Sequence, residues 1–216
     1  MKKRVIQAIL DEKIIAIARG LTPEQCVAAA KALYAGGIRL VEVTFDQSQK
    51  IPFSKTAEAI SAIAKEFEGK MYVGAGTVLT PEQVQIAADA GASYIISPDA
   101  NPEVIRKTVE LGLVSIPGVL TPSEATAAHR AGADFGKVFP AGNMGAGYIK
   151  AIRAPLNHIP LLAVGGISDA NVADFLAAGC CGAGIGGNLV NKTWIANGEF
   201  DKITEVAART VAAAKG

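Results

Sequence analysis

The sequence has little cysteine and little histidine, and this scarcity argues against two classes of protein. Only three cysteines occur, and two of them, Cys180 and Cys181, are adjacent. An odd number at this spacing does not fit the disulfide framework of a small secreted domain. The two histidines, His129 and His158, have no Cys, Asp or Glu partner at the spacing of a metal site. We therefore expect reduced cysteines and neither a metal ion nor a cofactor.

The chain also lacks an excess of charge and a long apolar run. Its net charge is +1, and its one basic cluster, Lys2-Lys3-Arg4, is typical of a solvated terminus. The first apolar stretch is interrupted at Asp11-Glu12-Lys13, and no run approaches the ~20 residues of a membrane-spanning helix. We therefore expect no signal peptide, no membrane segment and no nucleic-acid partner, in a cytoplasmic protein.

What the chain has in abundance is apolar residues, which make up 50% of its 216 positions. They are concentrated in short runs that alternate with helical patterns. The runs are apolar on both faces, as strands covered on both sides must be. They are too short for buried helices, and they end in Gly or Pro. We expect eight strands: Ile14–Arg19, Leu40–Phe45, Met71–Gly76, Tyr94–Pro98, Val114–Gly118, Phe135–Pro140, Leu161–Gly166 and Gly182–Gly187.

Three connectors begin with a shared helix-start signal. They are Thr22-Pro23-Glu24-Gln25, Thr80-Pro81-Glu82-Gln83 and Thr121-Pro122-Ser123-Glu124. The Thr caps the helix, Pro pre-sets φ at the first helical position, and Gln or Glu at the third completes a capping box. Asn101 and Ser168 open looser versions, and the helices end at glycine.

A strand–helix unit repeated eight times closes most naturally into a barrel. The structural alternative is an open doubly wound sheet, which usually carries GxGxxG after its first strand. Here that turn is Arg19-Gly20-Leu21-Thr22 and lacks the motif. We predict one α/β domain over residues 1–216, a (β/α)₈ TIM barrel with an extra N-terminal helix from Lys2 to Leu10 across its bottom.

Three charged residues lie within the expected strands: Arg19, Glu42 and Lys137. Such residues are seldom buried without a partner, and functional groups of a barrel lie at the carboxyl ends of its strands. Lys137 is either half of a structural ion pair or a desolvated amine that can attack a carbonyl. Glu42 shares a strand face with Thr44, and it either neutralises Lys137 or Arg19 or acts as a general acid/base. The two interpretations of Glu42 are compatible.

Hydroxyl and glycine residues end three further strands. Thr77 follows the third strand and is either a donor to a substrate carboxylate or an ordinary strand-end hydroxyl. Gly165-Gly166 ends the seventh strand, and Gly186-Gly187-Asn188 follows the eighth. Barrels often bind phosphate in the loops after these two strands, whereas tight packing is the alternative explanation for the glycines.

Taken in order, six motifs resemble one family over almost the whole chain. Each is weak alone, but the combination is specific: Val41-Glu42-Val43-Thr44, Gly74-Ala75-Gly76-Thr77-Val78, Ser97-Pro98, Pro117-Gly118-Val119-Leu120-Thr121, Lys137-Val138-Phe139-Pro140-Ala141 and Gly165-Gly166-Ile167. The chain resembles the bacterial 2-keto-3-deoxy-6-phosphogluconate (KDPG) aldolases, also called 4-hydroxy-2-oxoglutarate (KHG) aldolases.

The resemblance implies a metal-free class I aldolase that assembles as a homotrimer and releases pyruvate and an aldehyde from a 2-keto acid. It gives Lys137 the Schiff-base position and Glu42 the proton-transfer position. It gives Thr77 a contact with the pyruvate carboxylate, and it places Gly165, Gly166 and Gly187 in the phosphate loops. From their places at the strand ends we also expect substrate contacts from Arg19, Pro98, Gly186 and Asn188.

Three positions depart from the family pattern. Asp46 stands where many members have Arg, Asn188 where they often have Ser, and Gly142 where they often have Glu. A carboxylate at position 46 is expected to repel an anionic substrate unless Arg19 offsets it. The departure at Asp46 leaves open a non-catalytic binding or regulatory barrel. A second alternative is a phosphosugar isomerase barrel, which would not require an imine at Lys137.

Overall fold

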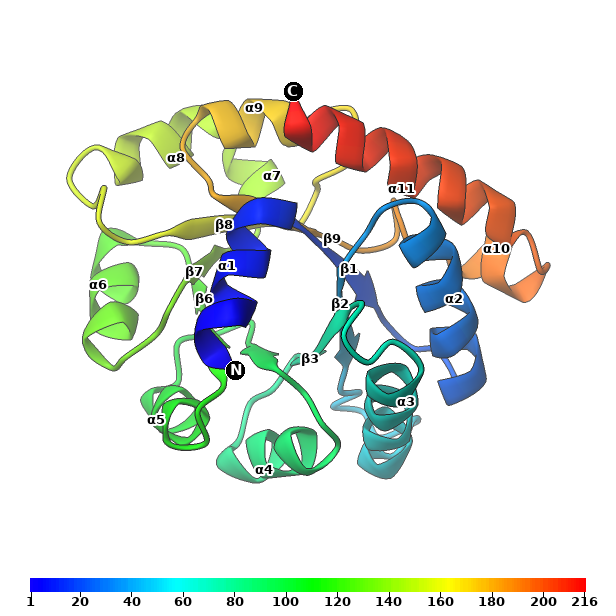
Figure 1. The fold of residues 1–216 in the computed structure, drawn as a ribbon. Helices are drawn as coiled ribbons and strands as arrows, with labels where there is room; N and C mark the ends of the chain where they lie inside the picture. Colours follow the sequence, from blue (N-terminus) through cyan, green and yellow to red (C-terminus); the bar gives the residue numbers. More distant parts are fainter.

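The computed structural model describes residues 1–216 as a parallel sheet curled into a nearly closed barrel and surrounded by helices (Figure 1). The strand order is β5-β4-β3-β2-β1-β9-β8-β7-β6, and every pair is parallel. All eight predicted runs form strands at the predicted places, so the barrel is confirmed. The strands are β1 (Ile14–Ala18), β2 (Leu40–Thr44), β3 (Tyr72–Gly76), β4 (Tyr94–Ile96), β5 (Val114–Ile116), β6 (Gly118–Val119), β7 (Gly136–Val138), β8 (Leu161–Val164) and β9 (Gly182–Ile185).

The prediction of a continuous strand over Val114–Gly118 was wrong, because the segment is divided at Pro117. β5 pairs with β4, whereas β6 pairs with β7, so the barrel closes along this one broken segment. The Pro117 carbonyl accepts a 2.8 Å hydrogen bond from the Lys137 N–H. Proline has no N–H to donate in return, and the ladder is therefore interrupted there.

Eleven helices flank the strands, and the predicted caps are largely present. Thr22 and Thr121 both form complete capping boxes, with Gln25 and Glu124 respectively. Thr80 also caps its helix, but the Gln83 side chain does not complete the box. The helices are α1 (Lys2–Glu12), α2 (Pro23–Ala35), α3 (Phe53–Glu66), α4 (Pro81–Asp89), α5 (Pro102–Glu110), α6 (Pro122–Arg130), α7 (Ala141–Met144), α8 (Ala146–Arg153), α9 (Val172–Ala177), α10 (Lys192–Ala196) and α11 (Phe200–Lys215).

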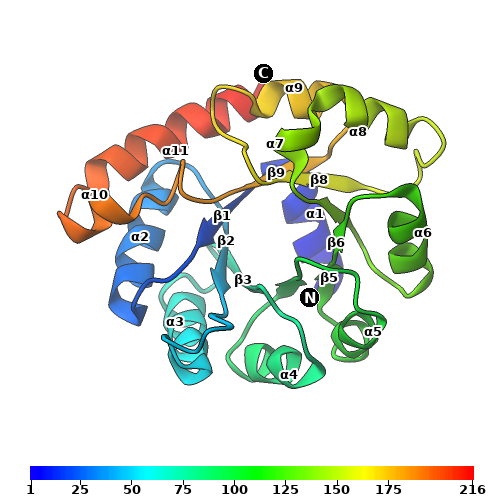
Figure 2. The ribbon, with the colours of Figure 1, turned by 180° about the vertical axis from the view of Figure 1, so that it is seen from behind.

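The predicted N-terminal helix closes one end of the barrel. In Figure 1, α1 lies across the strands, and Figure 2 shows the opposite end with α1 behind them. Val5 and Ile9 are fully buried against apolar side chains of the barrel interior. Lys2 is not merely solvated, because it forms a 2.9 Å ion pair with Asp134. Because α1 covers this end of the barrel, a ligand site can form only at the other end, where the carboxyl ends of the strands lie.

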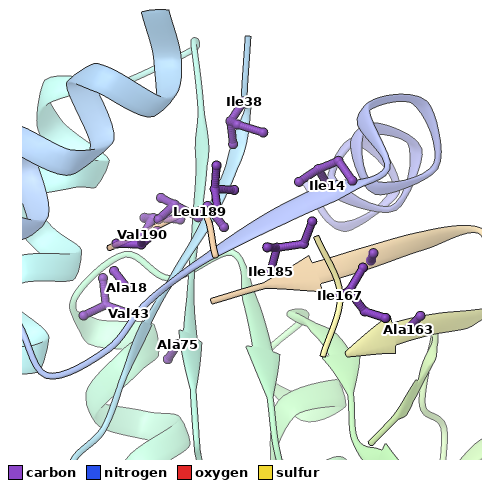
Figure 3. Close-up of a cluster of buried hydrophobic side chains, with 14 of the residues drawn as sticks. Ile14, Ala18, Ile38, Val43, Ala75, Ala163, Ile167, Ile185, Leu189 and Val190 are labelled. Carbon is purple, nitrogen blue, oxygen red and sulfur yellow. The ribbon is translucent and has the colours of Figure 1, made fainter. Parts of the chain in front are cut away.

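Side-chain alternation divides the strand residues between two environments. One set packs between the sheet and the helices, and Figure 3 shows part of it, including Ile14, Val43 and Ile185. The alternate set points into the barrel, with Leu40 in the apolar layer above α1 and Glu42 one step closer to the strand ends. None of the helices combines the length and apolar character needed to cross a membrane.

Candidate active site

The two residues predicted to be catalytic are brought together inside the barrel. Lys137 in β7 and Glu42 in β2 are 4% and 1% exposed, and the charge of each acts on the pKa of the other. No carboxylate is close enough to Lys137 for an ion pair. Its amine instead lies 5.0 Å from the ring centroid of Phe139. The purely structural ion pair considered for Lys137 is therefore not formed.

Burial dominates the electrostatics of this pair. Burial raises the pKa of Glu42, against the opposing charges of Lys137 and Arg19. The pKa of Lys137 is lowered by burial first and by Arg19 last, while Glu42 opposes the shift. One Glu42 oxygen, Oε2, is buried without a hydrogen-bond partner. Both shifts favour the neutral forms, so the amine gains nucleophilic character and the carboxyl can hold and release a proton.

Two glycines of β3 make room for buried side chains, Gly76 for the Glu42 carboxyl group and Gly74 for the Tyr94 ring. A Cβ on Gly76 would lie 2.6 Å from Glu42 Oε2, and a Cβ on Gly74 would lie 2.2 Å from the Tyr94 ring. Tyr94 is fully buried and donates a 2.6 Å hydrogen bond to the Val41 carbonyl, beside Glu42. The Gly-Ala-Gly sequence of β3 therefore shapes the pocket for Glu42.

A cavity of about 520 Å³ extends from Lys137 towards the ends of β8 and β9. Its wall includes most of the predicted anion-binding residues: Gly165, Gly166, Gly186, Gly187 and Asn188. Gly165 and Gly166 have φ values of +89° and +75°, a conformation that other residues rarely adopt. The two predicted glycine loops thus meet around one cavity that Lys137 also lines.

The structure accounts for two of the three departures from the family pattern at this cavity. Gly142 N–H donates a 2.7 Å hydrogen bond to the Gly165 carbonyl, and a Cβ on Gly142 would lie 2.9 Å from Gly166 Cα. A side chain at position 142 would therefore displace the glycine loop. Asn188 Nδ2 donates to the Ile167 carbonyl at 3.0 Å and so joins the loops after β8 and β9.

The third departure, Asp46, lies in a second cavity of about 410 Å³ at the ends of β1, β2 and β3. Its carboxylate accepts hydrogen bonds from Ser48 N–H, Ser48 Oγ and Ile51 N–H. These bonds lower the pKa of Asp46. The carboxylate is therefore bound into the turn that follows β2.

Thr77 lines the same cavity and has a strained backbone. Its φ is +56°, a left-handed value that a β-branched residue seldom adopts and that costs of the order of 1–3 kcal/mol. Thr44, on the inward face of β2, shares this wall. Sequence alone placed Thr77 at a strand end but contained no sign of the strain.

Two cations line both cavities. One is Arg19, which was predicted, and the other is Lys192 at the start of α10, which was missed. Lys192 Nζ lies 2.6 Å from where a Cβ of Gly20 would be, so this lysine reaches across to the β1–α2 turn. In the sequence, the one indication that Lys192 lies near the site was its position four residues after the Gly186-Gly187-Asn188 motif. Pro98, also predicted, lies two residues after the end of β4 and lines neither cavity.

The histidines lie apart from this site. His129 and His158 are exposed, and their rings meet edge to face with centroids 5.5 Å apart. No group of three or more His, Cys, Asp or Glu side chains is arranged to hold a metal ion. The three cysteines are free.

Fold and site together define a (β/α)₈ barrel in which a buried lysine lines a ligand-sized cavity and interacts electrostatically with a buried carboxyl group. The sequence model of the KDPG and KHG aldolase family matches residues 5–206. The chain therefore belongs to that family, and the resemblance inferred from its motifs is confirmed.

Individual relatives match along most of the chain. The 2-dehydro-3-deoxy-6-phosphogalactonate aldolase of Escherichia coli (strain K12) is 40% identical over 177 residues, covering 82% of this chain and 83% of the relative. The KHG/KDPG aldolase of the same strain is 38% identical over 196 residues, covering 89% and 87%. The crystal structure of a Legionella pneumophila KDPG aldolase, with pyruvate captured at low pH as a covalent carbinolamine intermediate, is 28% identical, with a TM-score of 0.85 over 95% of this chain and 97% of that one.

Proposed function

We propose that this protein is a class I aldolase in which the Lys137 amine forms a Schiff base with a 2-keto acid. The observation that carries the proposal is the buried Lys137 amine, which is free of any ion pair, lines a cavity and interacts electrostatically with the buried Glu42. The covalent carbinolamine with pyruvate described for the Legionella relative supports the same chemistry here.

The reaction follows from the two buried groups. Neutral Lys137 Nζ attacks the C2 ketone, and loss of water from the carbinolamine leaves a protonated imine. That loss of water takes up one proton, from the neutral Glu42 carboxyl or from solvent, and the positive charge of the imine favours the ionised form of Glu42. The Glu42 carboxylate, directly or through water, then takes the C4 hydroxyl proton as the C3–C4 bond breaks, and the electron pair of that bond moves into the imine to form an enamine. The aldehyde leaves. Protonation of C3 and addition of water then release pyruvate and regenerate the Lys137 amine.

Each of the two cavities binds a different end of the substrate. The carboxylate beside C2 is bound in the second cavity, where Thr77 supplies a hydroxyl and Arg19 a positive charge. The far end of the substrate extends into the first cavity, where glycines of the loops after β8 and β9 line the wall and let backbone N–H groups approach an anion. Lys192 adds a cation to that end.

We propose a six-carbon 2-keto-3-deoxy-6-phospho sugar acid as the preferred substrate, over unphosphorylated 4-hydroxy-2-oxoglutarate. The names of the two Escherichia coli relatives refer to sugar acids that differ in configuration at C4. A panel of both 6-phospho acids, their unphosphorylated analogues and 4-hydroxy-2-oxoglutarate, assayed for pyruvate release, tests the reaction and the substrate together. A phosphosugar isomerase or a non-catalytic binder would release no pyruvate.

The phosphate site is tested by the ratio of kcat/KM for a phosphorylated acid and its unphosphorylated analogue. We expect a preference above about tenfold, ~1.4 kcal/mol of transition-state binding. Gly187→Val should reduce this ratio, because Gly187 lines the cavity and a Cβ there meets no atom within 4 Å. Equal losses on both substrates would indicate damaged packing instead of lost phosphate recognition.

We also propose a homotrimer, on the strength of the family resemblance. Light scattering should then give three times the 22.2 kDa of one chain. A monomer at assay concentration would refute this assembly without affecting the proposed chemistry.

A further inference from the structure

Gln83 departs from the pattern that its own sequence motif predicts. In the two matching motifs, the side chains of Gln25 and Glu124 return to the backbone N–H of the capping threonine. Gln83, only 3% exposed, accepts a 2.7 Å hydrogen bond from the Leu79 N–H through Oε1, as Glu124 does from the Leu120 N–H, but it does not bond the Thr80 N–H. Its Nε2 donates to Gln47 Oε1 at 3.0 Å.

Gln47 continues this hydrogen-bond chain to the strained threonine. Its Nε2 donates to the Thr77 carbonyl at 2.7 Å. Gln47 therefore fixes the Thr77 carbonyl, and Gln83 fixes the N–H of Leu79, two residues further along the chain. The two amide groups connect the loop after β2, the turn after β3 and the helix α4.

Asp46 sets the position of Gln47. The Asp46 carboxylate accepts hydrogen bonds from Ser48 and Ile51, and these bonds close the turn that contains Gln47. The residue that departs from the family pattern is thus the one that organises this loop.

We propose that the Gln47–Gln83 pair, presented by the Asp46 turn, positions Thr77 for the carboxylate of the 2-keto acid. The inference rests on the proposed function, because it assumes that the Thr77 hydroxyl contacts that carboxylate. A left-handed β-branched residue persists only where its surroundings determine its conformation, and these hydrogen bonds supply that constraint. Gln47 and Gln83 are therefore positioning residues, and neither is required to touch the reacting atoms.

The test uses Gln83→Leu, which keeps the side-chain volume but loses both amide contacts, and Gln47→Ala, which changes an exposed loop residue. The matched control is Gln85→Leu on the same helix, where the amide bonds only Asp89. For each protein, borohydride reduction is measured over a range of pyruvate concentrations. We expect the half-saturating pyruvate concentration to rise about tenfold for Gln83→Leu and Gln47→Ala, the scale of a lost hydrogen bond to a charged group. The trapping rate at saturation should change less than about threefold, because Lys137 and Glu42 are untouched.

Gln83→Glu adds a readout that general destabilisation would not produce. Protonated, the new carboxyl can donate to Gln47 Oε1 as the amide did. Ionised, it offers only acceptors. At each pH we take the ratio of the half-saturating pyruvate concentrations of variant and wild type. This ratio should be close to one at low pH and should increase as the pH rises.

Two outcomes would overturn the positioning role: unchanged pyruvate saturation in both Gln83→Leu and Gln47→Ala, or a pH-independent ratio for Gln83→Glu. A Gln83→Leu protein that fails to fold leaves Gln47→Ala to decide. Failure of the proposed function is distinguishable, because wild-type protein would then trap no pyruvate at all.

Discussion

Gly76→Ala should disable proton transfer while leaving Schiff-base formation largely intact. The added methyl group would lie 2.6 Å from Glu42 Oε2 and 2.7 Å from its Cδ. Ordinary contacts are near 3.5 Å, so the carboxyl group must withdraw by roughly 0.8 Å. Both strands carrying these residues are held by a five-residue parallel register, and the side chain therefore yields before the backbone. A displacement of about 1 Å can cost up to ~10²-fold in a positioned catalytic group.

The assay follows exchange of pyruvate methyl protons with deuterated solvent by NMR, alongside borohydride trapping. We expect exchange and cleavage to fall by about 10²-fold, with trapping at saturating pyruvate within a few-fold of wild type, and a stability loss of about 1–3 kcal/mol from overpacking. Gly147→Ala is the matched control, since nothing lies within 4 Å of the added atom. Wild-type exchange in folded Gly76→Ala would refute the assignment of proton transfer to Glu42.

Three further predictions concern the charged groups of the site. Glu42→Gln should still form the imine but slow methyl-proton exchange by ~10²-fold or more, the scale of a positioned acid/base, and unchanged exchange would assign that step elsewhere. Arg19 lowers the pKa of Lys137, so Arg19→Gln should raise that pKa and move the acid limb of trapping at saturating pyruvate to higher pH; a shift to lower pH would contradict the electrostatics. Lys192→Gln should raise KM for the phosphorylated acid several-fold and leave its unphosphorylated analogue nearly unchanged, since a fixed cation favours the more highly charged ligand. Equal effects on both substrates would remove Lys192 from phosphate recognition.

The barrel could be predicted because its signals are local and repeated. Eight short apolar runs and threonine caps each depend on a few adjacent residues, and the structure has every one of those strands. The division of the fifth strand at Pro117 was the exception. A proline in a short apolar run indicates a lost N–H, but only the neighbouring strands show that the barrel closes there.

The chemical centre was also predictable, because Lys137 and Glu42 are charged residues in runs that must be buried. The contacts around them were not, since they join residues that are distant in sequence. Gln83 illustrates the limit: its motif is the one that forms a capping box elsewhere, yet the loop after β2 diverts its amide to Gln47. Lys192 was missed for a similar reason, because its side chain reaches a turn at the other end of the chain.

The departure at Asp46 shows how a single position can mislead. From sequence, a carboxylate in place of Arg suggested repulsion of an anionic substrate. In the structure its oxygens are occupied by Ser48 and Ile51, and Arg19 and Lys192 line the same cavity. The net field at the mouth depends on side-chain directions, which sequence spacing does not provide.

Reductive trapping of pyruvate tests the central proposal most directly. Wild-type protein is treated with pyruvate and borohydride, digested, and analysed by peptide mass. A Schiff base at Lys137 predicts one modified peptide, carrying the reduced pyruvate adduct on that lysine, and none in Lys137→Arg, whose guanidinium stays protonated and cannot form the imine. An unmodified wild-type peptide at saturating pyruvate, or the same adduct on another lysine, would contradict the assignment.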